Sequence, residues 1–63
     1  MITREFAEKY RDCYEAGMTI EEYVDFFKSC QSFAEEIGDV DFAKLNDAEL
    51  AELAQAVIEI NEH

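Results

Sequence analysis

Apolar residues recur every three or four positions in three stretches of the chain, the spacing that is typical of amphipathic helices. The first stretch predicts a helix from Arg4 to Ala16, with Thr3 as its N-cap and Gly17 directly after its end. Its apolar stripe consists of Phe6, Tyr10, Cys13 and Tyr14.

The second stretch carries the clearest start signal in the chain. Thr19 and Glu22 form a T-x-x-E capping box, and the pattern continues to Ile37, just before Gly38. At about 100° per residue, the apolar positions cover roughly half of the helix circumference, which is wider than a one-sided stripe. We therefore expect this helix to be central and to touch both neighbours. Its apolar positions are Ile20, Tyr23, Val24, Phe26, Phe27, Cys30, Phe33, Ala34 and Ile37.

The third stretch predicts a helix from Asp47 to Ile60, with Asn46 as N-cap and Glu49 three positions later. Between Gly38 and Asn46, either Asp39 or Asp41 could cap a single helical turn. No alternating run of β-branched residues predicts a strand. The predicted fold is all-α: one acidic domain over residues 1–63, a small compact bundle of three main helices plus a short helical turn near residues 40–45.

Charge and composition then limit the class of protein. The 63 residues include 16 acidic and five basic side chains, for a net charge of −11. Such a charge favours disorder, but 49% hydrophobic residues and eight aromatic rings favour a folded domain. The chain has no apolar signal region and no membrane-length apolar run, so we expect a soluble, cytoplasmic protein. Cys13 and Cys30 are then expected to be free thiols, the alternative being a disulfide between the first two helices.

Motifs for catalysis and for metal or cofactor binding are missing from the sequence. The segment that begins at Asp39 opens like a calcium loop, but Ala43, Lys44 and Leu50 stand where an EF-hand needs a ligand, a glycine and a bidentate glutamate. There is no glycine-rich phosphate loop, and the sole histidine is His63. We therefore expect a non-enzymatic protein without a metal or cofactor.

Acidic residues are ordered along the predicted helices. On the first helix four carboxylates would form a straight ridge, with about 5 Å per charge, against about 3.4 Å for one DNA strand. Few Glu–Lys pairs at i, i+4 balance the acids of the later helices. We predict that a basic partner is bound by the ridge Glu5, Glu8, Asp12 and Glu15, together with Glu21, Glu22, Asp25, Glu35 and Glu36.

In size, charge, helical content and absence of catalytic motifs, the chain resembles the small acidic phage-encoded inhibitors of host defence, of the anti-CRISPR and anti-restriction DNA-mimic type. The resemblance implies a cytoplasmic partner in a bacterial host: a basic nucleic-acid-binding protein such as a CRISPR-Cas subunit, whose groove the carboxylates would occupy. Direct binding of nucleic acid is disfavoured by the sign of the charge, and a role at anionic membranes is disfavoured in the same way.

Two other interpretations stay open. The acids could simply form a solvated surface. Alternatively, the wide apolar arc of the second helix predicts a protein–protein adaptor or antitoxin-like module, if Phe26 or Phe33 is exposed in the folded monomer. A monomer in solution favours the mimic, and an obligate dimer favours the adaptor.

Overall fold

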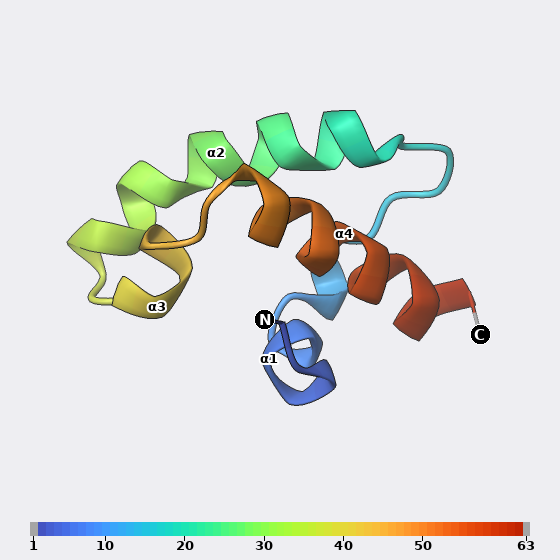
Figure 1. The fold of residues 1–63 in the computed structure, drawn as a ribbon, viewed down its shortest axis with the longest axis horizontal. Helices are drawn as coiled ribbons and strands as arrows, with labels where there is room; N and C mark the ends of the chain where they lie inside the picture. Colours follow the sequence, from blue (N-terminus) through green and yellow to red (C-terminus); the bar gives the residue numbers. More distant parts are fainter. Residues whose placement is uncertain (1, 63) are drawn as a thin grey trace.

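The computed structural model describes residues 2–62 and contains helices and turns only. Along the chain come α1 (Arg4–Glu8), the 3₁₀ turn η1 (Arg11–Cys13), α2 (Ile20–Glu36), α3 (Val40–Ala43) and α4 (Asp47–Glu62). Figure 1 shows α4 running below α2 at an angle to it, with α3 beneath the end of α2 and α1 below α4. The all-α bundle and the short helix near residues 40–45 are confirmed.

Helix α4 is the central element of the bundle. It packs against α2 on one side and against α1 and η1 on another. Leu50, Leu53, Ala54 and Val57 recur at helical spacing on its buried face and are completely inaccessible to solvent. The prediction that the second helix is central is therefore wrong, because α2 makes its main contacts with α4 and α3 alone.

The two long helices begin where the sequence predicts. The Thr19 hydroxyl accepts the Glu22 N–H at 3.1 Å, and the Glu22 carboxylate accepts the Thr19 N–H at 2.9 Å. At α4 the Asn46 side chain accepts the Glu49 N–H at 2.9 Å, while the Glu49 carboxylate accepts the Asn46 N–H at 3.0 Å. Both capping boxes satisfy backbone donors that the first helical turn leaves without partners.

The first helix is much shorter than the predicted Arg4–Ala16. A continuous helix would pair the Glu15 N–H with the Arg11 carbonyl. Instead, the Tyr23 hydroxyl accepts the Glu15 N–H at 2.9 Å and donates to the Glu15 carbonyl at 3.1 Å. The Arg11 carbonyl accepts from the Asn61 side chain at 3.0 Å. Side chains of α2 and α4 thus take both backbone groups of that helical bond, and the segment turns away after Glu8.

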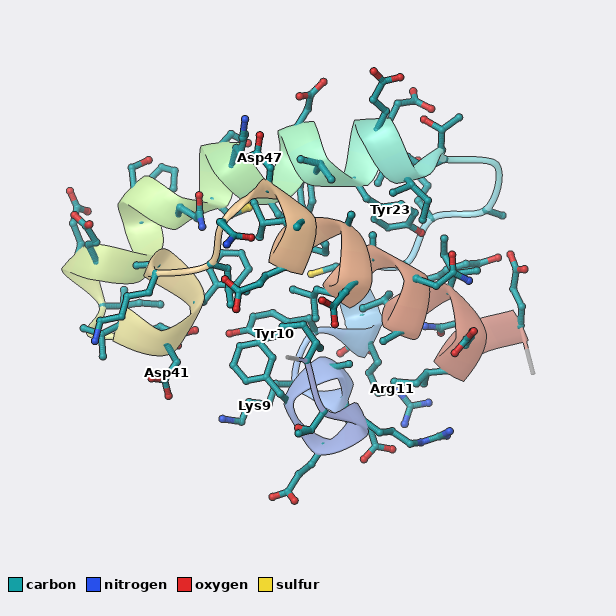
Figure 2. The ribbon with its side chains drawn as sticks, viewed as in Figure 1. Lys9, Tyr10, Arg11, Tyr23, Asp41 and Asp47 are labelled. Carbon is teal, nitrogen blue, oxygen red and sulfur yellow. The ribbon has the colours of Figure 1, made fainter. Side chains whose placement is uncertain are left out.

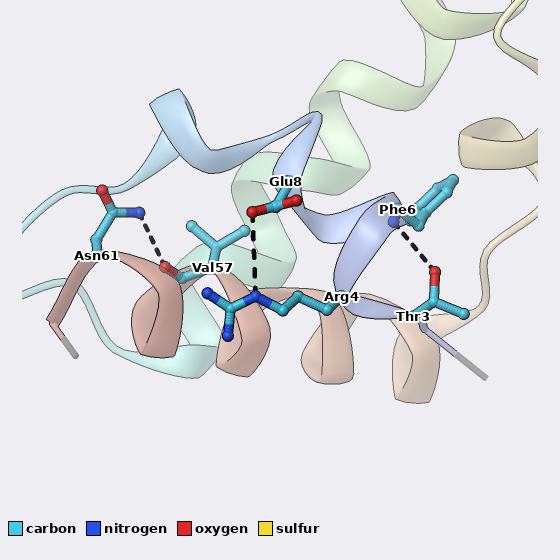
Figure 3. A network of polar contacts seen from close by, with 6 residues as sticks. All are labelled: Thr3, Arg4, Phe6, Glu8, Val57 and Asn61. Carbon is cyan, nitrogen blue, oxygen red and sulfur yellow. Dashed lines mark hydrogen bonds and ion pairs between the residues drawn. The ribbon is translucent and has the colours of Figure 1, made fainter.

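Side-chain hydrogen bonds also form at the start of α1 and in the last turn of α4 (Figure 3). The Thr3 hydroxyl accepts the Phe6 N–H at 3.1 Å, which confirms Thr3 as the N-cap of α1. The Asn61 amide, besides its bond to Arg11, donates to the Val57 carbonyl one turn earlier in α4 at 2.9 Å. Asn61 therefore connects the last turn of α4 to the η1 turn.

The Gln31 side chain holds α3 beneath α2. Its amide nitrogen donates to the Phe42 carbonyl at 3.1 Å and to the Leu45 carbonyl at 2.9 Å. These two carbonyls lie at the end of the short α3, where the Phe42 carbonyl also accepts the Leu45 N–H at 3.2 Å. One α2 side chain thereby fixes the position of the whole α3 segment.

Replacing Gln31 with glutamate tests this role. Gln31→Glu removes the amide donor and places a carboxylate against two carbonyl oxygens, so we expect a loss of about 2 kcal/mol or more in the free energy of unfolding. Gln55→Glu, an identical change at an exposed position of α4, should cost less than about 0.5 kcal/mol. Urea unfolding followed by circular dichroism measures both. Equal stability of the two variants would contradict the assigned role.

Candidate binding groove and acidic surface

An apolar groove lies on the surface between α2 on one side and η1 and α3 on the other. Its volume of about 220 Å³ is below the roughly 300–1,000 Å³ of pockets that enclose drug-sized ligands. A groove of this size suits single side chains of a partner better than a whole small molecule. Nine residues line it: Tyr10, Cys13, Phe27, Cys30, Phe33, Ala34, Ile37, Asp39 and Phe42.

Helix α2 contributes an exposed apolar stripe beside its buried one. Phe26, Cys30, Phe33 and Ile37 follow each other at intervals of four, three and four residues, which places them within about 60° of the helix circumference. Phe26 is 42% exposed, Phe33 67% and Ile37 80%. Val40, at the start of α3, is 53% exposed. Large apolar side chains in such a continuous row point to a surface that another molecule covers.

Aromatic packing forms the floor of the groove. The Tyr10 ring stacks on Phe42 at a centroid distance of 5.0 Å and lies 5.3 Å from Phe6. Phe27 meets Phe42 edge-on at 5.9 Å, and both are almost fully buried. Such ring pairs favour tilted or offset geometries and contribute beyond the area they bury. The floor therefore belongs to the core, while Phe33 and Ile37 stand above it.

The Tyr10 hydroxyl joins this floor to α3 by donating to the Asp39 carboxylate at 2.7 Å. Figure 2 shows Tyr10 lying between the α1–η1 segment and α3, the helix that carries Asp41. Burial and the hydrogen bond to Asp39 raise the pKa of Tyr10, and the charges of Asp39 and Asp41 raise it further. Asp39 was predicted as a cap of the short helix; it stands at the N-cap position, but its side chain binds Tyr10 instead of the backbone.

The two cysteines are free thiols, and both line the groove. Each is partly buried, as expected for small apolar side chains on the inner faces of their segments. Burial, and then the neighbouring Cys30 and Asp12, raise the pKa of Cys13. A raised thiol pKa lowers the fraction of nucleophilic thiolate, so the surroundings of Cys13 do not activate it.

The four carboxylates of the predicted ridge do not share a helix. Glu5 and Glu8 lie on α1, Asp12 lies in η1, and Glu15 lies in the following loop. Glu8 also forms an ion pair with Arg4, with 4.0 Å between the guanidinium nitrogen and the carboxylate oxygen (Figure 3). The prediction of a straight ridge is therefore wrong, because the helix that would carry it ends at Glu8. All four side chains are nevertheless exposed.

The five predicted acids of the second helix are exposed on an unbroken helix: Glu21, Glu22, Asp25, Glu35 and Glu36. Glu22 is used locally in the capping box, and its hydrogen bonds with the Thr19 backbone and hydroxyl hold the pKa of Glu22 below its usual value. Lys28, the one cation of α2, forms an ion pair with Asp47 at the start of α4 at 3.0 Å. Among residues 2–62, no ion pair forms with Glu21, Asp25, Glu35 or Glu36.

Other kinds of site find little support in the part of the chain that the structure describes. No group of three or more Cys, His, Asp or Glu side chains converges there in a way that could hold a metal ion. None of the helices between residues 2 and 62 combines the length and apolar character that a bilayer crossing requires. His63 lies outside the described residues.

The groove was only partly visible in the sequence. The broad apolar arc of the second helix signals more apolar surface than its neighbours can cover, and Phe26 and Phe33 were identified on that arc. The contribution of Tyr10, Cys13 and Asp39 depends on where η1 and α3 fold back, which no local pattern encodes.

Comparison with protein-family models, characterised proteins and solved structures finds no match to this chain.

The Tyr10–Asp39 hydrogen bond predicts a pH dependence of stability. Because folding raises the pKa of Tyr10, its contribution is complete below the unfolded pKa near 10. It declines as the pH rises above 10, where the unfolded chain releases the tyrosine proton more readily than the folded chain does. At pH 8, Tyr10→Phe should cost about 1 kcal/mol, a reduced value because solvent screens this partly exposed pair.

Urea unfolding of both proteins from pH 8 to pH 11 measures this effect. The stability difference between the wild type and Tyr10→Phe should shrink above pH 10. Because every other titrating group is common to the two proteins, the difference isolates Tyr10. A difference that stays constant or grows with pH would contradict the assigned hydrogen bond.

Proposed function

We propose that this chain is a non-enzymatic protein-binding module that engages its partner through the apolar groove. The observation that carries the proposal is the exposure of Phe33 and Ile37 above that groove. Removing apolar area from water contributes about 25 cal/mol per Å², so leaving two large side chains in water has a cost that a bound partner would relieve.

The rest of the surface is consistent with a binding module. The groove has an almost entirely apolar lining with one carboxylate, Asp39. The floor beneath it is rigid, because Tyr10, Phe27 and Phe42 pack on one another and Gln31 fixes α3. A rigid surface loses less conformational freedom on binding than a mobile one.

Affinity capture tests the groove. Immobilised wild-type protein should retain from a cell lysate a partner that Phe33→Gln/Ile37→Gln loses by at least about tenfold, because buried apolar anchors dominate binding energy. Both positions are exposed, so the double variant should unfold at a urea concentration close to that of the wild type.

The matched control introduces the same two glutamines elsewhere. Ala16 and Ala48 are exposed and lie outside the groove, so Ala16→Gln/Ala48→Gln should retain the partner fully. The proposal fails if the groove variant and this control capture the same proteins in the same amounts.

A second candidate function is supported by the carboxylates of α2. Asp25 and Glu35 are exposed, make no ion pair within residues 2–62, and are separated by about 15 Å along the same helix. Carboxylates in such an array can stand in for phosphates and meet the Arg and Lys side chains of a target. On this second proposal the protein is a nucleic-acid mimic that blocks a basic site of a host defence protein, such as a CRISPR-Cas effector, in the bacterial cytoplasm.

Charge reversal and DNA competition test the mimic. Asp25→Lys/Glu35→Lys should release a captured target. Glu8→Lys/Asp12→Lys should have a weaker effect, because Glu8 and Asp12 lie on different elements and do not form one ridge. Capture should fall as salt rises, and added duplex DNA should displace the target. If DNA has no effect on a target that the groove variant loses, the contact is apolar and the mimic is excluded.

A further inference from the structure

We infer that the occupant of the groove is a cationic amphipathic helix of a partner protein. This inference rests on the proposed function and names the chemistry of the partner. It follows from three properties of the surface: the length of the exposed stripe, the acids that border it, and the absence of a strand edge in residues 2–62.

The exposed stripe has the dimensions of a helix-binding surface. From Phe26 to Ile37, the C-cap residue of α2, it spans 11 residue steps, or about 16 Å along the helix axis. A partner helix of about three turns covers that length and presents apolar side chains at i, i+3 or i+4, and i+7 on one face. A helix satisfies its own backbone hydrogen bonds, whereas an extended peptide needs a strand edge to pair with, and the described residues form no sheet.

Acids border the groove on both sides. On α2, Asp25 and Glu36 fall next to the exposed stripe on the helix wheel, on the side away from the core. On the other side, the carboxylate of Asp39 lines the groove itself. None of the nine lining residues carries a positive charge. An apolar helix face flanked by Lys and Arg matches this arrangement.

A second copy of the chain fits the same surface poorly. Two copies docked groove to groove would bring together two sets of bordering carboxylates, on molecules that each carry a net charge of −11. Juxtaposed like charges cost several kcal/mol in an interface. The surplus of acids that disfavours self-association is the same feature that attracts a cationic partner.

Designed peptides of about 14 residues, long enough for about four helical turns, provide the test. The first carries leucines at helical spacing and lysines elsewhere, the second replaces the lysines with glutamates, and the third has the leucines and lysines in strict alternation. Isothermal titration with the full chain should show binding of the helical leucine–lysine peptide, and at least about tenfold weaker binding of the other two.

Variants of the chain locate the contact. Phe33→Gln/Ile37→Gln should weaken the helical leucine–lysine peptide at least about tenfold. Asp25→Asn/Glu36→Gln, which removes the two acids next to the stripe, should weaken it by a smaller factor and reduce its salt dependence. Glu52→Gln/Glu59→Gln removes the same charge from α4, which contributes no residue to the groove, and should leave the affinity within about twofold.

Several results would overturn the inference. One is equal binding of the alternating peptide, which would mean attraction by charge without helix recognition. Another is unchanged binding to the groove variant. Groove-dependent dimerisation of the chain alone, seen by sedimentation equilibrium, would make a second copy the occupant. A captured partner that binds the groove through an extended or acidic segment would also refute the inference, while leaving the proposed function intact.

Discussion

The packing of α4 against both α2 and the α1–η1 segment is the constraint on which the rest of the structure depends. Leu50, Leu53 and Val57 are fully buried because α4 has neighbours on more than one side. A 63-residue chain buries only about 60% of its unfolded surface, so not every apolar position of its two long helices can be covered. Part of the broad apolar arc of α2 therefore stays exposed to solvent. This exposed part forms one side of the groove.

Contacts with the two long helices also explain why the first helix ends early. Backbone groups near Glu15 and Arg11 are bound by Tyr23 and Asn61, so the chain after Glu8 follows the surface of the two long helices instead of continuing its own spiral. This path brings Tyr10 and Cys13 to the side of α2. Structure and candidate function are thus linked, because an uninterrupted first helix would not bring these side chains to the groove in the same way.

Local signals in the sequence predicted what is local in the structure. The capping residues Thr19, Glu22, Asn46 and Glu49 fixed the starts of α2 and α4, and the segment after Gly38 contains the expected short helix. The first helix and the carboxylate ridge could not be predicted correctly, because the hydrogen bonds that interrupt the helix come from residues up to 50 positions away. The wide apolar arc of α2 indicated one side of the groove. The other side, formed by η1 and α3, depends on tertiary contacts.

Solvent exposure of the Ile37 methyl groups in solution is the most direct test of this account. A soluble paramagnetic probe broadens NMR signals of methyl groups that it can approach, and the buried Val57 serves as an internal reference. In the monomer, the Ile37 methyl signals should broaden strongly while those of Val57 stay sharp. Methyl signals of Ile37 that are as protected as those of Val57 would mean that the groove is closed, and would contradict the account.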